Sequence, residues 1–147
     1  MINKLLSFFQ KQEEDQQEHN PNLAAAALLV EVMYADHDLS ATERNKVKGI
    51  LYDTLFLTEE VSEELLKSAE AEVKDANDLF QFTDVLNETY SPAEKIALVE
   101  SLWRVAYADQ VIDKYEEHMV RRISDLLHVA HSDFMQAKHK ARNSGGA

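Results

Sequence analysis

The chain has 147 residues, the length of one ordinary domain, which is enough to bury a core without disulfides or structural metals. It contains no cysteine, so disulfide frameworks, thiolate zinc sites and cysteine nucleophiles are excluded, and a cytoplasmic location is expected. The formal net charge of −12 argues against nucleic acid as a partner, because the chain repels a polyanion. No apolar run reaches the ~20 residues that span a bilayer, so we expect no transmembrane segment.

The composition favours helices over hairpins, because only 3 Gly and 2 Pro accompany 45% hydrophobic residues. We therefore predict an all-α fold, a single compact bundle of seven or eight helices. Residues 1–20 are expected to form an N-terminal amphipathic helix and a polar joint, residues 21–142 the helical domain, and residues 143–147 a disordered tail.

The first twelve residues carry apolar side chains that collect on one face of a helix. Only two lysines lie among them, and four acidic residues follow at positions 13–18, so anionic lipid is poorly matched. We expect residues 1–12 to dock on the core or on a partner rather than on a membrane surface. The apolar residues are Ile2, Leu5, Leu6, Phe8 and Phe9.

The next helices follow from apolar spacing and from start signals. A helix from about Asn22 to Asp36 contains an alanine run that predicts close packing. Thr58 is expected to cap the helix that carries the acidic run 59–78, which we interpret as a solvated face. Asp75 or Asn77 is expected to cap the helix that ends near Tyr90.

The clearest helix start is Ser91, Pro92 and Glu94, which predicts a capping box with proline in the first helical position. Ser40 with Glu43 and Asp113 with Glu116 repeat the same spacing. A last helix is expected to begin near residue 131.

One stretch of the chain occurs twice. Tyr34–Glu43 reads YADHDLSATE and Tyr107–Glu116 reads YADQVIDKYE, at an offset of 73 residues. Each copy follows an apolar helical run and precedes another, and Leu39 in the first corresponds to Ile112 in the second. The repeat predicts two pseudo-repeated helix-loop-helix units that pack as a pseudo-twofold core, with these apolar residues directed inward.

The repeated pattern, YAD-x-x-(L/I)-(S/D)-x-x-E in an acidic helical chain, resembles the tellurite-resistance protein B (TerB) family over about residues 23–142. It is also similar to the N-terminal part of a membrane-anchored DnaJ-like co-chaperone. The resemblance implies a compact helical bundle, no established catalytic activity, and a metal-linked or stress-response role of the tellurite type. Family members typically have glycine after Ala-Asp, where this chain has His37 and Gln110.

The two loops are rich in oxygen ligands, which hard cations prefer. We expect the same residues to cap helices and to accept amide hydrogens within the turns. A weakly bound divalent cation, Ca²⁺ or Mg²⁺ before Zn²⁺, is the alternative that the sequence leaves open. The candidate ligands are Asp36, Asp38 and Glu43 in the first loop and Asp109, Asp113 and Glu116 in the second.

Other candidate sites receive less support from the sequence. Asp125, His128 and His131 have a spacing at which a metal can be held, but the surface end of a helix is the simpler explanation. His37 and His118 each neighbour one loop, which leaves a mixed carboxylate and imidazole site open. Phosphate-binding, dinucleotide-binding and nucleophile-elbow motifs are absent from the sequence, so no enzyme is expected.

These observations favour a non-enzymatic binding or adaptor domain with one or more protein partners. Two alternatives remain open. The first is a metal-dependent hydrolase with a carboxylate-lined site, which requires two metals ~3.5–4 Å apart. The second is a purely structural interaction module that docks a partner through residues 1–12. The oligomeric state is left open by the sequence.

Overall fold

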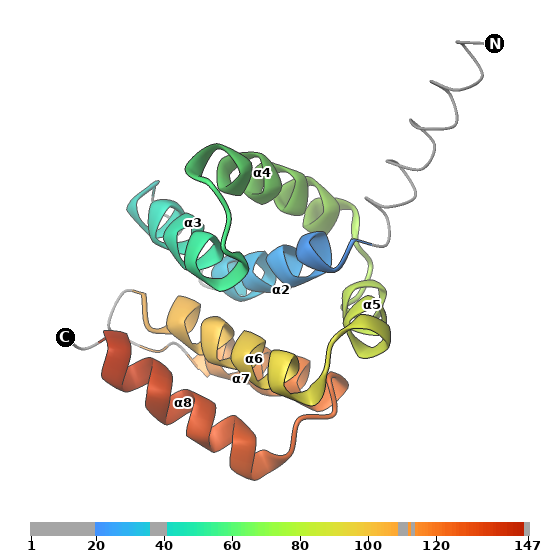
Figure 1. The fold of residues 1–147 in the computed structure, drawn as a ribbon, viewed down its shortest axis with the longest axis vertical. Helices are drawn as coiled ribbons and strands as arrows, with labels where there is room; N and C mark the ends of the chain where they lie inside the picture. The colour runs from blue at the N-terminus through green and yellow to red at the C-terminus, as the bar shows by residue number, and fades with distance from the viewer. Residues whose placement is uncertain (1–19, 36–40, 109–111, 113, 146–147) are drawn as a thin grey trace.

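Seven helices and no strand make up the described part of the chain (Figure 1). The computed structural model describes residues 20–35, 41–108, 112 and 114–145. The seven helices confirm the predicted all-α bundle. The helix predicted within residues 1–20 lies outside the described residues. The helices are α2 (Pro21–Ala35), α3 (Ala41–Leu55), α4 (Glu59–Asp75), α5 (Phe80–Thr89), α6 (Pro92–Ala106), α7 (Lys114–Leu126) and α8 (His131–Gly145).

Helix α2 is the centre of the bundle. It contacts α3, α4, α5, α6 and α7, and the run from Leu23 to Val30 is buried throughout. Four consecutive alanines, residues 24–27, let neighbouring backbones approach closely, as the sequence predicted. A helix enclosed on so many sides needs apolar residues around its whole circumference, which explains why α2 shows almost no polar face.

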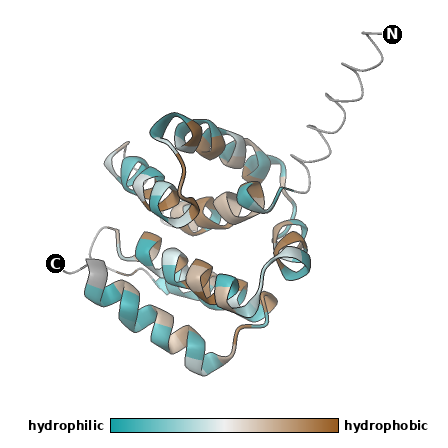
Figure 2. Cartoon of the chain, in the orientation of Figure 1, coloured by the Kyte–Doolittle hydropathy of each residue, from teal (hydrophilic) through white to brown (hydrophobic). Residues whose placement is uncertain are grey.

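Helix α6 is the second central element. It contacts α2, α3, α7 and α8, and it buries Leu98, Leu102 and Trp103. In Figure 1 α4 and α8 lie on opposite outer sides of the bundle, with α2 and α6 between them. The outward side of α8 is mostly hydrophilic in Figure 2. The core is therefore built around α2 and α6.

The two halves of the bundle have matching partners. Helix α2 contacts α3 and α4, as α6 contacts α7 and α8, and the cross-contacts α2–α7 and α3–α6 also correspond. Of the two apolar loop residues, Leu39 and Ile112, only Ile112 lies among the described residues. It packs against the core. This pattern is the one expected of two repeated units, whereas the pseudo-twofold relation itself stays a prediction.

Most helix starts follow the local signals. Ser91 Oγ accepts a hydrogen bond from the backbone N–H of Glu94 at 3.2 Å, and the Glu94 carboxylate accepts one from the Ser91 N–H at 3.0 Å. Thr58 accepts from the Val61 N–H at 3.2 Å. Both predicted caps are confirmed. Helix α2 begins at Pro21, one residue earlier than predicted, with the Asn20 side chain as its cap at 2.9 Å.

The predicted cap of α5 is wrong. Asp75 is the last residue of α4, and Leu79 occupies the N-cap position of α5 without a side-chain hydrogen bond. Asp78 accepts a hydrogen bond from the Phe80 N–H at 2.8 Å. Several capping residues occur in succession here, and the length of α4 decides which of them faces the next helix.

Two helices end on a residue with left-handed backbone. Phe56 after α3 has φ 55°, and His128 after α7 has φ 61°. The next residue donates its N–H back to the preceding turn in each case, Leu57 to the Tyr52 carbonyl at 3.3 Å and Val129 to the Ser124 carbonyl at 3.1 Å. This is the Schellman arrangement, which usually has glycine at the left-handed position.

Helix α8 continues to Gly145, past the expected domain end at residue 142. The division of the chain at residues 20 and 142 stays a prediction. None of the described helices is both long enough and apolar enough to cross a bilayer.

Candidate functional site

Two of the six predicted metal ligands lie among the described residues. Glu43 is the third residue of α3 and Glu116 is the third residue of α7. Both therefore stand where a capping box places its glutamate. Asp36, Asp38, Asp109 and Asp113 lie outside the described residues, as does His37 of the mixed carboxylate and imidazole alternative.

The two glutamates differ in how deeply they are buried. Glu116 is 3% exposed, whereas Glu43 is half-buried, and both have interaction partners. A carboxylate as buried as Glu116 requires hydrogen bonds, because leaving it unsatisfied costs several kcal/mol. Capping is thus the role that their described positions fit, and a bound cation must share these oxygens with the helix ends.

The helix ends that flank the two loops lie on the same side of the bundle (Figure 1). These are the ends of α2 and α6 and the beginnings of α3 and α7. The Lys46 ammonium donates a hydrogen bond of 2.7 Å to the carbonyl oxygen of Ala108, the last described residue before positions 109–111. Helix α3 of the first unit is therefore joined directly to the start of the second loop.

Antiparallel packing of α3 and α6 brings about this contact. Ser101 and Thr54 share a hydrogen bond of 2.8 Å between their hydroxyls, and Arg104 lies 3.5 Å from the Asp53 carboxylate. As α6 advances from Ser101 to Ala108, its partners move back along α3 to Lys46. The end of α6 is thus held by three polar contacts, which fixes the point where the second loop begins.

A charged network joins α2, α3 and α4. The Arg44 guanidinium donates to Glu70 at 2.7 Å and to Glu63 at 3.2 Å, and the Tyr34 hydroxyl donates to Glu70 at 3.3 Å. The hydrogen bond to Glu70 is the largest cause of a raised pKa of Arg44. Burial, followed by the charge of Glu70, raises the pKa of Tyr34.

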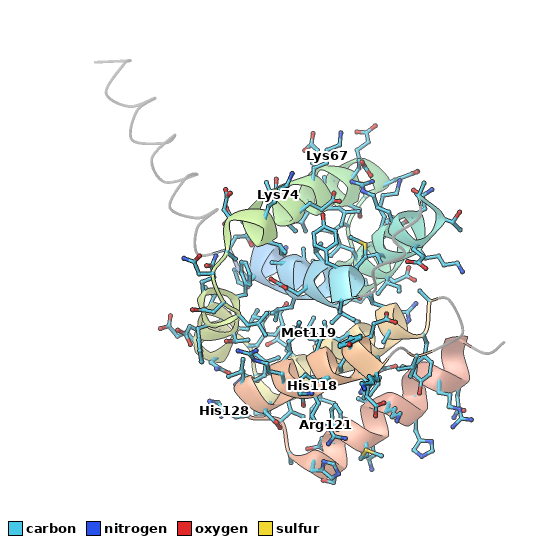
Figure 3. All side chains as sticks on the ribbon, turned by 180° about the vertical axis from the view of Figure 1, so that it is seen from behind. Lys67, Lys74, His118, Met119, Arg121 and His128 are labelled. Carbon is cyan, nitrogen blue, oxygen red and sulfur yellow. The ribbon has the colours of Figure 1, made fainter. Side chains whose placement is uncertain are left out.

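The acidic run of α4 is therefore divided between two roles. Glu63 and Glu70 turn toward α3 and pair with Arg44, and Lys48 lies 3.6 Å from Glu63. The remaining acidic residues face solvent, as do Lys67 and Lys74, which Figure 3 labels on the outer side of α4. The predicted solvated face is confirmed for that part only. The solvent-facing acidic residues are Glu59, Glu60, Glu64, Glu72 and Asp75.

Aromatic rings pack between the second loop and α8. Trp103 is fully buried, with its ring centroid 6.1 Å from that of Tyr107 and 5.2 Å from that of Phe134. The Lys138 ammonium lies 5.1 Å from the Trp103 centroid and 3.6 Å from the Glu117 carboxylate. The indole Nε1 is buried and has no hydrogen-bond partner among the described residues. Trp103 is thus a packing residue close to the start of the second loop.

No group of three or more metal-binding side chains occurs within the described ranges. The spacing of Asp125, His128 and His131 therefore does not produce a metal site. The reason is local, because His128 sits at the left-handed residue that ends α7 and His131 begins α8 in a new direction. Figure 3 shows His118, Arg121 and His128 on the α7 side of the molecule.

Sequence reasoning missed Arg44 and Lys46. Their partners lie 26 and 62 positions away in the chain, at Glu70 and Ala108. The basic residues of α3 follow no spacing that identifies such partners. A weak signal existed, since the strongly acidic α4 follows a helix that carries Arg44, Lys46 and Lys48.

A family model for "Tellurite resistance protein TerB" matches residues 22–139. No curated protein and no solved structure matches the chain. The matched range begins at the start of α2 and ends within α8, so it includes both acidic repeats and the helices that flank them. The chain belongs to the TerB family.

Proposed function

We propose that this chain is a non-enzymatic TerB-type binding module whose two acidic loops together hold a divalent cation. The observation that carries the proposal is that the helix ends flanking the two acidic loops lie on one side of the bundle (Figure 1). The hydrogen bond between Lys46 and Ala108 also joins the first helix-loop-helix unit to the start of the second loop. Two weak sets of ligands whose flanking helix ends lie on one side of the bundle can act as one site.

The chemistry of the ligands suits a hard cation. Carboxylate oxygens from Asp36, Asp38 and Glu43 can combine with those from Asp109, Asp113 and Glu116, with water completing the shell. Ca²⁺ and Mg²⁺ fit such a set better than Zn²⁺, which prefers nitrogen and sulfur. The solvent-facing acidic residues of α4 add negative potential to the molecule.

The first test is the melting temperature of the EDTA-treated protein with added Ca²⁺, Mg²⁺ or Zn²⁺. A cation at ~100 times its dissociation constant adds about 2.7 kcal/mol of stability, which corresponds to a rise of roughly 5–11 °C. Asp36→Asn and Asp109→Asn should each remove the rise, whereas Asp84→Asn on the exposed side of α5 should retain it. No rise in the wild type with any of the three ions contradicts the proposal.

Stoichiometry then separates the binding module from the hydrolase alternative. One cation per chain agrees with a shared site. Two bound cations, together with hydrolysis of a phosphate ester or a peptide bond, would favour a binuclear enzyme. Trp103 is the sole tryptophan of the chain and lies near the second loop, so its fluorescence reports on cation binding there.

We further propose that the cation-bound state engages a protein partner in a tellurite-type stress response. The support is membership of the TerB family. Cells carrying Asp36→Asn and Asp109→Asn should lose tellurite tolerance and recover fewer cross-linked partners than wild-type cells. Unchanged tolerance with variants that no longer bind the cation would separate the two roles and refute this link.

A further inference from the structure

Phe56 combines two features that each cost free energy. Its side chain is 94% exposed, and its backbone has φ 55° at a helix end where glycine is usual. A residue with a Cβ is strained in this conformation, whereas glycine is not. A side chain this exposed gains little packing energy that could offset the backbone strain. A bulky apolar residue held in this way points to a binding role.

Two further exposed apolar side chains lie close to Phe56 in the sequence. Tyr52 lies one helical turn before Phe56 and is 45% exposed, and Val61 in the first turn of α4 is also 45% exposed. The Leu57 N–H donates to the Tyr52 carbonyl, which fixes the turn that displays Phe56. We refer to Tyr52, Phe56 and Val61 as the aromatic turn. It presents apolar side chains from a rigid connection between two helices.

Acidic side chains outnumber basic ones around the aromatic turn. Asp53 is exposed and lies 3.5 Å from Arg104. Glu59 is 84% exposed at the start of α4 and lies 4.0 Å from the Lys48 ammonium, whereas Glu60 and Glu64 face solvent. A ligand for this surface should therefore carry apolar side chains together with positive charge.

We propose that residues 1–12 of this same chain occupy the aromatic turn. They contain six apolar residues, five of which share one face at helical spacing, two lysines and no acidic residue, so they match the turn in both hydrophobicity and charge. Residues 13–19 can span up to about 25 Å when extended, and α2, which follows them, packs against both α3 and α4. The proposal does not depend on cation binding by the acidic loops.

Two of the other exposed aromatic residues, Phe80 and Tyr115, fit this segment less well. Phe80 is 50% exposed and Tyr115 is 58% exposed, and each lies in the first turn of a helix with ordinary backbone. Lys114 stands next to Tyr115, which disfavours a cationic ligand there. Phe56 alone unites high exposure, left-handed backbone and acidic neighbours among the described aromatic residues.

The test uses a nitroxide spin label on Ser7→Cys in the full chain, which has no other cysteine. In the ¹⁵N-labelled protein, the amide signals of residues 52–61 should lose intensity through paramagnetic broadening. Phe56→Asn should restore those signals, because it removes the aromatic ring while asparagine tolerates the left-handed conformation. Phe80→Asn is the matched control and should leave the broadening intact.

Three results would overturn the proposal. The first is an absence of broadening in residues 52–61, and the second is broadening that persists in Phe56→Asn. The third is broadening that appears equally when spin-labelled unlabelled protein is mixed with ¹⁵N-labelled protein without a label, since that places a second copy on the aromatic turn. A melting temperature of Phe56→Asn at or above that of the wild type shows that loss of broadening does not come from unfolding.

Discussion

The ammonium group of Lys46 lies 2.7 Å from the carbonyl oxygen of Ala108 and donates a hydrogen bond to it. The two residues belong to different helix-loop-helix units, and the contact places a positive charge beside the second acidic loop. This charge stabilises the C-terminal end of α6, where the negative end of the helix dipole lies. It also opposes a divalent cation in the same region, so the contact links the fold to the proposed site.

Replacing Lys46 by methionine should therefore strengthen cation binding. The expected gain in affinity for Ca²⁺ is about two- to fivefold, the order produced by removing one partly screened unit charge near a divalent ion. Titration calorimetry at constant ionic strength measures it. Lys67→Met on the outer side of α4 is the control and should change the affinity less (Figure 3). A weaker affinity for Lys46→Met would show that the lysine orders the site instead.

Removing the Arg44 guanidinium should destabilise the packing of α3 on α4. Arg44→Gln loses the hydrogen bonds to Glu63 and Glu70 and leaves Glu70 without its guanidinium partner. The loss of the hydrogen bonds to Glu70 should cost about 1 kcal/mol. Denaturant unfolding measures it, with the exposed Arg122→Gln as control. Equal stability of the two variants would mean that solvent screens the network completely.

Glu31 should make the stability depend on pH in the acid range. Burial of this carboxyl against the core raises its pKa above the usual 4.5. A raised folded pKa means that the contribution of Glu31 is fully present below pH 4.5 and is lost as the pH rises through the folded value. At pH 7 the buried charge is therefore unfavourable.

Glu31→Gln should consequently stabilise the protein at pH 7, by roughly half a kcal/mol because solvent screens this half-buried carboxyl, and leave the stability unchanged near pH 3.5. Thermal unfolding at several pH values measures the difference. Glu88→Gln on the exposed surface of α5 is the control. A larger stabilisation at low pH than at neutral pH would mean that the ionised form of Glu31 is the favourable one in the folded protein.

Overpacking the alanine run should cost more than the same change on the surface. Ala27 is 0% exposed at the centre of α2, whereas Ala97 is exposed in the middle of α6. Leucine and alanine both favour helix, so Ala97→Leu should be nearly neutral and Ala27→Leu should lose about 1–3 kcal/mol. Chemical denaturation compares them. A neutral Ala27→Leu would show that α2 packs loosely against its neighbours.

The fold was largely predictable because its signals are local. Ser91, Pro92 and Glu94 specify a helix start within four residues, and the helix begins where they predict. The start of α5 was not predictable, because Asp75, Asn77 and Asp78 are all able to cap a helix. Contacts of α4 with α2 decide how far α4 continues, and such contacts are absent from a local pattern.

The candidate site was predictable only in part. Glu43 and Glu116 occupy the third helical position that the repeat indicates. The pairing of Arg44 with Glu70 depends on how α3 and α4 pack, which no spacing in the sequence encodes. The left-handed backbone of Phe56 was equally inaccessible, since sequence patterns associate that conformation with glycine or asparagine.

The enclosure of α2 has a consequence during synthesis of the chain. Its apolar run leaves the ribosome before the helices that cover it, and its cover includes α6 and α7, which end about 70 to 100 residues later. At typical rates of roughly 5–20 residues per second, this segment stays uncovered for about 5–20 s. The bundle can close only when most of the chain has emerged, so α2 is the segment most exposed to premature association with other nascent chains.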